Sequence, residues 1–312
     1  MKIGFVPKIY DESPGVARRY VSIRDLVQQA EAEGFDSIWI YDHLLMRSEG
    51  KPTEGLWESW TILTALAEAT RKVELGTIVL CTQFRNPALL AKMAATFDEV
   101  SGGRLTLGLG AGSHEPEFKA FGYPFDHRVG RFEEALKIIG PLLRDGRVDF
   151  TGKYYQAIDC EIAPRGPRPK GPPILVAGAG ARMLRLTAQH ADLWNTAWLG
   201  KPEPLVARKA AIDQACVADG RDPATLGLTV GIIVSFAGPG DPPSTRDVVT
   251  GSTEEVAATL AQYDRLGVNH LLVIVDPETP AILTKLAGAV RLYRSNRRSQ
   301  GPTLPMSGRS AG

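Results

Sequence analysis

Short runs of valine, isoleucine and leucine alternate with longer segments of helical periodicity along most of this chain. Eight of the short runs have the length of a buried strand, and a segment with the pattern of an amphipathic helix follows each one. The runs are residues 2–7, 37–43, 73–80, 105–110, 174–177, 193–197, 228–236 and 270–276. Because parallel strands return through right-handed helical crossovers, eight such units predict a closed (β/α)₈ TIM barrel of the α/β class.

Residues at the ends of the predicted helices support these boundaries. Asn86 followed by Pro87 is typical of a helix start, because asparagine caps free amides and proline lacks the N–H that would stay unpaired there. Ser252 and Glu255 have the spacing of a capping box, and Gly34 is placed to end the first helix before its strand. The local signals and the barrel periodicity therefore agree.

An open, doubly wound sheet shows the same alternation and is the alternative architecture. Such a sheet usually carries a Gly-x-Gly-x-x-Gly turn after its first strand, and residues 2–14 contain none. Eight equal units can instead close on themselves without leaving a sheet edge. We therefore expect the barrel.

Two segments depart from the repeat and set the predicted domain bounds. Residues 146–173 form an insertion before the fifth strand, in which 149–155 resemble a small hairpin and 164–173 an extended proline-rich arm. An insertion of this size in a barrel often shapes a substrate pocket. Residues 295–312 lack a periodic apolar face, so we expect a disordered tail after a single barrel domain over residues 1–294.

Composition argues against several classes of partner. The 312 residues include 36 Lys and Arg against 35 Asp and Glu, and a net charge of +1 gives no general attraction for nucleic acid or for an anionic membrane surface. Apolar runs stay far below the roughly 20 residues of a membrane span. The chain enters a strand-like run at once, without the pattern of a signal peptide, which predicts a cytoplasmic protein.

The cysteines and acidic residues give no sign of a disulfide framework or a metal. Cys81, Cys160 and Cys216 are odd in number and far apart, which favours reduced thiols. No histidine and acidic residues have metal-ligand spacing, so no metal is expected. We expect Asp98 and Glu99 to be solvated residues of a helix.

The second strand ends in a group of polar and aromatic residues. Active sites of barrels lie at the carboxyl ends of the strands, and here that end reads Tyr41-Asp42-His43. Strand alternation puts His43 on the same face as Trp39 and Tyr41. A histidine at this place can exchange a proton or donate a hydrogen bond, or it can simply satisfy a core carbonyl. We predict that His43 belongs to the site.

The fourth strand has an inner face almost without side chains. Its leucines alternate with Thr106, Gly108 and Gly110. Missing side chains leave room for a planar ring in the barrel mouth or let backbone amides approach a ligand, and tight barrel packing is the alternative interpretation. We predict ligand room.

The turn after the fifth strand gives the strongest sign of a phosphate. Residues 177–181 read Ala-Gly-Ala-Gly-Ala and open the next helix. Small residues let a phosphate reach unpaired N–H groups at the positive end of a helix, and Arg182 adds charge. No dinucleotide fingerprint is complete, so we expect the single phosphate of a mononucleotide-type cofactor, with an ordinary tight turn as the alternative.

Several stretches share the pattern of one known family. They are EGFDSIW at 33–39 before Asp42-His43, RNP at 85–87, SGGRL at 101–105 before GLGAG at 108–112, EFKAFG at 117–122 and GAG at 178–180. Together they resemble the bacterial-luciferase-like superfamily, especially its branch dependent on the deazaflavin coenzyme F420. The resemblance spans roughly residues 1–293.

The resemblance implies a set of cofactor contacts. Asp42 and His43 would flank the deazaflavin ring, and a bulge at Thr77-Ile78-Val79, with a non-prolyl cis peptide between Ile78 and Val79, would support its back face. The phosphate would lie on Gly178, Ala179 and Gly180, and the ring edge would meet Gly110, Ala111, Gly112, Ser113 and His114, with Asn195 and Thr196 close by. Relatives that act on sugar phosphates carry a glutamate proton donor just after the fourth strand. This chain has Ser113-His114 there, which speaks against that substrate class.

The expected activity is hydride transfer between a small organic substrate and F420, with His43 as the acid or base. The expected walls of the substrate pocket are Trp39, Trp194, Trp198, Ser113, His114 and the 146–173 arm. An FMN-dependent monooxygenase is one alternative, and a flavin-binding barrel without turnover is another. The resemblance also implies that two copies pair as a homodimer.

Overall fold

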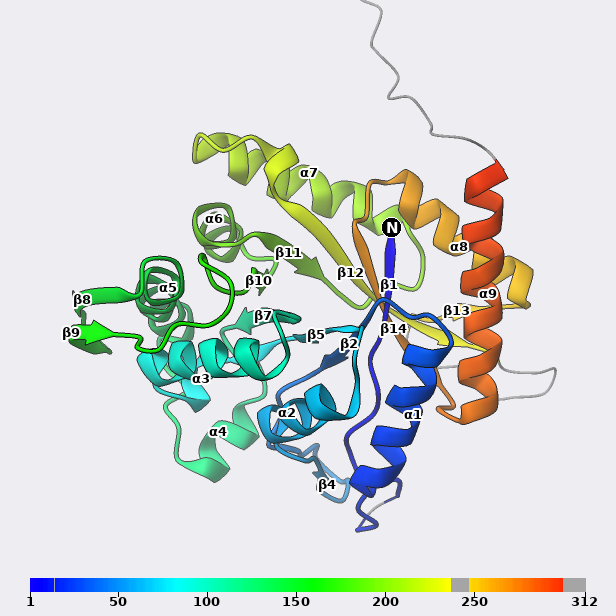
Figure 1. Ribbon diagram of the computed structural model, residues 1–312, viewed down its shortest axis with the longest axis horizontal. Coiled ribbons are helices and arrows are strands. Elements are labelled where there is room, and N and C mark those ends of the chain that lie inside the picture. Colours follow the sequence, from blue (N-terminus) through cyan, green and yellow to red (C-terminus); the bar gives the residue numbers. More distant parts are fainter. Residues whose placement is uncertain (14, 237–246, 300–312) are drawn as a thin grey trace, which may run out of the picture.

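The computed structural model describes residues 1–13, 15–236 and 247–299. At its centre, eight parallel strands close into a barrel (Figure 1). In order around the barrel they are β1 (Lys2–Phe5), β2 (Ser37–Ile40), β5 (Glu74–Thr77), β7 (Leu105–Gly110), β10 (Ile174–Ala177), β11 (Leu193–Thr196), β12 (Gly227–Ser235) and β14 (His270–Asp276). Pairing of β7 with β10 and of β14 with β1 completes the circle. The predicted (β/α)₈ barrel is confirmed, and every strand overlaps its predicted range.

Helices surround the strands on all sides (Figure 1). The outer layer consists of α1 (Tyr20–Ala32), α2 (Ser59–Ala69), α3 (Pro87–Val100), α5 (Arg128–Arg144), α6 (Ala181–His190), α7 (Glu203–Ala218), α8 (Thr253–Arg265) and α9 (Pro280–Ser299). A shorter helix, α4 (Glu115–Phe121), and the 3₁₀ turns η1 (Thr82–Phe84) and η2 (Pro223–Thr225) lie in the connections.

The predicted helix caps are present. The Asn86 side chain accepts hydrogen bonds from two amides of α3, with Pro87 as its first residue. Ser252 and Glu255 form the reciprocal bonds of a capping box at the start of α8. Gly34 follows α1 with a φ of +88°, a conformation that costs glycine little.

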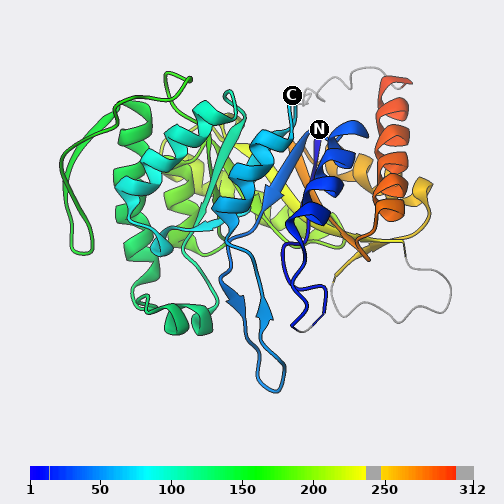
Figure 2. The same ribbon diagram turned by 60° about the horizontal axis from the view of Figure 1, so that its bottom comes forward.

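Two hairpins extend from the barrel. β3 (Leu45–Met46) pairs with β4 (Glu54–Gly55) after the second barrel strand, and Figure 2 shows this hairpin on the same side of the barrel as α4. In the insertion, β8 (Arg147–Thr151) pairs with β9 (Gln156–Glu161), which confirms the predicted hairpin and lengthens it in both directions. Two further short strands, β6 (Leu80–Cys81) and β13 (Val249–Thr250), pair with β7 and β12.

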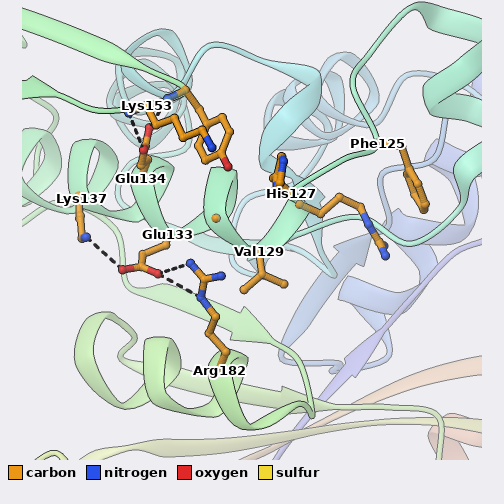
Figure 3. Close-up of a pocket in the computed structure, with 11 residues that line it drawn as sticks. Phe125, His127, Val129, Glu133, Glu134, Lys137, Lys153 and Arg182 are labelled. Carbon is orange, nitrogen blue, oxygen red and sulfur yellow. Dashed lines mark hydrogen bonds and ion pairs between the residues drawn. The ribbon is translucent and has the colours of Figure 1, made fainter.

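The proline-rich arm lies elsewhere than expected. Arg168 from this arm donates to both carboxylate oxygens of Asp98, at 2.9 and 2.5 Å, and to the carbonyl of Leu105, the first residue of β7. Residues 164–173 therefore cross the amino end of the strands and do not wall the mouth, whereas Lys153 and Tyr154 of the same insertion line a groove beside it (Figure 3). The prediction that Asp98 is solvated is also wrong, because its side chain is fully buried in this ion pair.

The last helix continues beyond the predicted domain boundary at residue 294. Its final turns are anchored to the barrel, since Arg294 donates to Asp36 at 2.7 Å and Arg297 pairs with Asp264 at 3.1 Å. Residues 295–299 are thus helical, contrary to the expected disorder. Residues 300–312, the rest of the predicted tail, lie outside the described residues.

Trp39 packs inside the barrel with Val6, Leu175 and Leu272. Trp39 is 1% exposed, and a Cβ atom at Gly76 or Gly4 would lie 2.3 or 2.9 Å from its indole ring. The Trp39 Nε1–H donates to the Ser37 hydroxyl, which lies 2.7 Å from Nε2 of His270. The glycines therefore make room for a bulky side chain that closes the barrel below its mouth.

Two absences hold for residues 1–13, 15–236 and 247–299. Their helices all lack either the length or the apolar character needed to cross a membrane. Their His, Cys, Asp and Glu side chains form no group of three that is placed to hold a metal ion.

Candidate active site at the mouth of the barrel

A cavity of about 360 Å³ opens at the carboxyl ends of β2, β5, β7 and β10. It brings together residues that are far apart in the sequence. Its lining includes Tyr41, Asp42, His43, Ile78, Val79, Leu80, Cys81, Gly110, Ala111, Gly112, Ser113, Glu117, Arg128, Val129, Ala177, Gly178 and Met183. The end of the second strand and the small-residue turn after the fifth barrel strand therefore lie on one rim, as the predicted site requires.

His43 is held by a buried carboxylate. Its Nδ1 lies 3.0 Å from Oε1 of Glu117, whose side chain is only 2% exposed, and the other carboxylate oxygen accepts the backbone N–H of Leu44 at 2.8 Å. Because a carboxylate only accepts, Nδ1 carries the proton of the neutral ring and Nε2 carries the lone pair. The His43 side chain is 30% exposed and lines the cavity, so it can exchange a proton there.

Asp42 lines the cavity, and its carboxylate is also held by a set of hydrogen bonds within the protein. Its carboxylate accepts two hydrogen bonds from Arg85, at 2.7 and 3.1 Å, one from the Ser59 hydroxyl at 2.6 Å and one from the backbone N–H of Cys81 at 3.0 Å. These bonds turn the carboxylate into the protein and occupy both oxygens. Asp42 thus fixes the end of β2 to the β5–β6 segment at the edge of the cavity.

The bulge between β5 and β6 forms one wall of the cavity. Ile78 and Val79 line it, and the peptide bond between them is cis, as predicted. Thr77, just before the bulge, is fully buried, and its hydroxyl bonds the backbone of Gly108 as both donor and acceptor. Thr77 therefore holds the bulge from inside the barrel wall.

The glycines of β7 are explained by close packing around this bulge. A Cβ atom at Gly108 would lie 1.8 Å from the Thr77 carbonyl oxygen, and one at Gly110 would lie 2.6 Å from the Val79 side chain. At Gly108 the packing interpretation is therefore the one that holds. The missing side chain at Gly110 makes room for the Val79 side chain, and both residues line the cavity.

The predicted phosphate turn lies where the cavity meets the end of β10. Gly178 lines it, Ala179 and Gly180 are exposed, and Gly180 is the N-cap residue of α6. Trp194 donates from Nε1 to the Gly178 carbonyl at 2.9 Å, which fixes the turn from below. The first turn of α6 has no acidic residue, so its amides present partial positive charge toward the rim.

Several predicted residues lie away from the cavity lining. Trp39 is buried below it, Asn195 donates to the Thr229 hydroxyl at 2.8 Å, and Thr196 accepts from Arg208 at 2.6 Å. Trp198 packs against Gly231 and is 37% exposed. The structure thus gives Asn195 a partner on β12 and Thr196 a partner on the outer helix α7. It gives neither tryptophan a place in this cavity.

The two residues after β7 differ from each other. Ser113 lines the cavity, whereas His114 accepts the backbone N–H of Arg47 at Nε2, with a distance of 3.1 Å. The His114 and His43 rings lie 6.3 Å apart between centroids, edge to face. His114 therefore anchors the β3–β4 hairpin next to the site.

Sequence reasoning missed Glu117 and Arg128. Glu117 was named only as part of a stretch shared with the family. Its position in the first turn of the helix after β7 was the signal that could have placed it near the mouth. Arg128 donates to the carbonyl of Gly112 at 2.8 Å and stacks 4.0 Å from the Phe125 ring centre. No local sequence pattern predicts these contacts of Arg128.

Cys81 lines the cavity but is not suited to attack a substrate. Burial raises the pKa of its thiol to about 12, so the thiolate that acts as a nucleophile is scarce at neutral pH. With an exposed fraction of 4%, Cys81 packs as a small buried side chain.

Comparisons with known proteins identify relatives of this chain. A model of the luciferase-like monooxygenase family matches residues 4–239. The F420-dependent glucose-6-phosphate dehydrogenase of Amycolatopsis mediterranei is 36% identical over 179 residues, which are 54% of this chain and 52% of that enzyme. The chain thus spans about half the length of that relative. The pyrimidine monooxygenase RutA of Klebsiella pneumoniae is 31% identical over 289 residues, 86% of this chain and 73% of that enzyme.

One solved structure shows how widely the fold is shared. An F420-dependent secondary alcohol dehydrogenase, in complex with an F420-acetone adduct, superposes with a TM-score of 0.79 at 19% identity. The match covers 94% of this chain and 99% of that one. At this identity the similarity establishes the fold.

Proposed function

The chain belongs to the luciferase-like monooxygenase family, and from that premise we propose that it is an oxidoreductase that transfers hydride between coenzyme F420 and a small organic substrate. One observation carries the proposal. A single cavity joins a histidine with a free ring nitrogen, an apolar wall and a turn of exposed amides.

The residues around the cavity fit a phosphorylated ring. Ile78 and Val79 offer an apolar surface on which one face of the ring would lie, and His43 would stand beside it. A Cβ atom at Gly178 would lie 2.8 Å from the Met183 side chain. Any residue other than glycine would therefore displace the turn. Gly178, Ala179 and Gly180 would hold the phosphate.

The proposed chemistry divides between the cofactor and the chain. A bound deazaflavin supplies hydride transfer. The chain positions the substrate and moves its proton: as hydride leaves or reaches a carbon that bears oxygen, His43 Nε2 takes or gives the hydroxyl proton. Glu117 keeps the proton on Nδ1 and stabilises the imidazolium that forms, in the way a buried carboxylate serves the histidine of a hydrolase triad.

The substrate is proposed only as a small organic molecule. Ser113 and His114 stand just after β7, where sugar-phosphate relatives would place a glutamate, so we do not extend the proposal to glucose 6-phosphate. The nearby Glu117 does not replace that glutamate, because both its oxygens are bonded to residues 43 and 44.

A binding measurement tests the choice of cofactor. The purified protein is titrated separately with F420 and with FMN, and the absorbance and fluorescence of each ring report binding. We expect saturable binding of F420 with much weaker binding of FMN. Tight binding of FMN without binding of F420 would reject the proposal.

An FMN-dependent monooxygenase is the second candidate. It is favoured by the similarity to RutA, which extends over 86% of this chain, more than the 54% matched by the F420-dependent relative. In this case the reduced cofactor would be consumed only in the presence of oxygen. Oxygen uptake that depends on reduced FMN separates this candidate from hydride transfer to F420.

A further inference from the structure

The β3–β4 hairpin is fastened to the rest of the protein on both of its strands. On the β4 side, the Gly55 carbonyl accepts the N–H of Asp11 at 3.0 Å, and the Gly55 N–H donates to the Asp11 carboxylate at 3.0 Å. Trp57, just after β4, donates its backbone N–H to the Ile9 carbonyl at 3.2 Å. This strand is therefore bound to the loop that follows β1, through contacts that involve no histidine.

On the β3 side, two side chains at the start of α4 hold the hairpin. Glu117 accepts the N–H of Leu44 at 2.8 Å, and Nε2 of His114 accepts the N–H of Arg47 at 3.1 Å. Residues 47–53 are all exposed, and the hydrogen bonds that the structure describes for 48–53 stay within the hairpin, which projects from the barrel (Figure 2). The bond to His114 is therefore the outermost attachment of β3.

This outermost bond requires a neutral imidazole. A nitrogen that accepts a hydrogen bond must carry a lone pair, so the single proton of the neutral His114 ring lies on Nδ1. A second proton would occupy Nε2 and set an N–H group against the N–H of Arg47. Histidine side chains take up such a proton within about pH 5 to 8. The bond is therefore made by the neutral ring and lost in the charged ring.

Titratable groups of both signs surround His114 at the end of β2 and on α4. The ring of His43 lies 6.3 Å away between centres, and a charge on His43 would oppose a charge on His114. On α4, Glu115 follows His114 directly, and Glu117 lies in the same first turn. Both carboxylates favour the charged ring, although Glu117 is already bonded to His43 and to the backbone of residue 44.

The hairpin itself contributes charges of both signs. The Arg47 guanidinium donates to the Thr53 hydroxyl at 3.2 Å, so it is turned along the hairpin. Glu54 stands opposite Met46 in the β3–β4 register. The contact of the hairpin with His114 is thus the backbone N–H of Arg47, which keeps its hydrogen throughout the pH range in which a histidine changes charge.

From this arrangement we propose that His114 is a pH-sensitive latch of the β3–β4 hairpin: the neutral ring holds β3 against α4, and protonation releases it. The β4 strand keeps its bonds to Asp11 and Ile9, so the released hairpin pivots on that strand. His43 lines the cavity four positions before Arg47, so release also loosens this rim of the mouth. The latch consists of the chain's own contacts and acts whichever cofactor the cavity takes.

Hydrogen exchange of single amides in the ligand-free protein tests the latch, because the bond to His114 protects the amide hydrogen of Arg47. Exchange is measured at about pH 8 and at about pH 5.5. Each rate is divided by that of the same amide in an unstructured peptide, which removes the intrinsic pH dependence of exchange and leaves the local opening. The Leu44 amide, which is bonded to Glu117, is the internal reference.

In the wild type, we expect protection of the Arg47 amide to fall about fivefold or more at the lower pH, while the Leu44 amide keeps its protection. His114→Gln places an amide oxygen near the position of Nε2 and takes up no proton, so protection should persist at both pH values. His114→Ala has no acceptor and should protect weakly at both. The control His190→Gln removes a half-buried histidine at the end of α6 and should behave as the wild type.

Two results would overturn the latch. One is equal protection of the Arg47 amide at both pH values in the wild type. The other is a pH-dependent loss that persists in His114→Gln, because a different group, such as His43, would then be its source. Since the protein carries no cofactor in these measurements, either result would leave the proposed hydride transfer untouched.

Discussion

Nδ1 of His43 lies 3.0 Å from a carboxylate oxygen of Glu117, and the two residues are 74 positions apart in the chain. The first stands after the second barrel strand and the second on α4, after β7. Their contact fixes which nitrogen of the histidine faces the cavity. In the proposed reaction this contact sets the direction of proton transfer.

Replacing His43 with alanine should slow turnover far more than it weakens cofactor binding. A positioned acid or base contributes about 10² to 10⁴ in rate, whereas the ring has most of its contacts elsewhere in the cavity. Turnover with F420 and the dissociation constant of F420 are measured on the same preparation. Unchanged turnover would remove His43 from the mechanism.

Replacing Glu117 with glutamine should lower kcat about tenfold or more and leave the F420 dissociation constant within about twofold. The amide keeps the size of the side chain but loses the charge that stabilises the imidazolium. The conservative Glu117→Asp should recover part of the loss if carboxylate charge is what matters. A fall in F420 affinity that matches the fall in kcat would instead indicate a purely structural role.

Replacing Asp42 with asparagine should cost about 3 kcal/mol of unfolding free energy. The change leaves the half-buried Arg85 without its main carboxylate partner and removes acceptors for Ser59 and the Cys81 N–H. Urea denaturation measures the loss. The control is Asp25→Asn, which breaks an exposed pair with Arg24 and should cost less than about 1 kcal/mol. Equal losses in the two variants would contradict the positioning role of Asp42.

Stability should fall as the pH drops below about 6.5, partly because of His270. Burial lowers the pKa of this histidine from 6.5 to about 3, so the unfolded chain takes up a proton in this range and the folded chain does not. Each pH unit between these values costs about 1.4 kcal/mol. Between pH 7 and pH 5 the wild type should therefore lose about 2 kcal/mol more than His270→Gln in urea denaturation. The same pH dependence in both proteins would show that His270 is not the source.

The barrel was predictable because its signals are local. Each strand is a short apolar run, and each cap, such as Asn86 with Pro87, lies within a few residues of the helix it begins. The rim that holds His43 and Gly178 followed from the rule that active sites of barrels gather at the carboxyl ends of their strands.

The contacts between distant residues could not be predicted in this way. Strand alternation put Trp39 on the same face of β2 as His43 but did not show how far below the mouth its ring lies. The glycines that make room for this ring lie on other strands, β1 and β5. The ion pair of Asp42 with Arg85, 43 residues away, follows from no local pattern. Glu117 and Asp98 likewise have buried partners that no spacing rule connects.

A crystal structure of the protein soaked with F420 tests the central claim most directly. The account predicts the deazaflavin ring against Ile78 and Val79, within hydrogen-bond reach of His43 Nε2 at about 3 Å, and the phosphate on the amides of residues 178–180. A ring bound outside this cavity, or a phosphate held at another edge of the barrel, would contradict it.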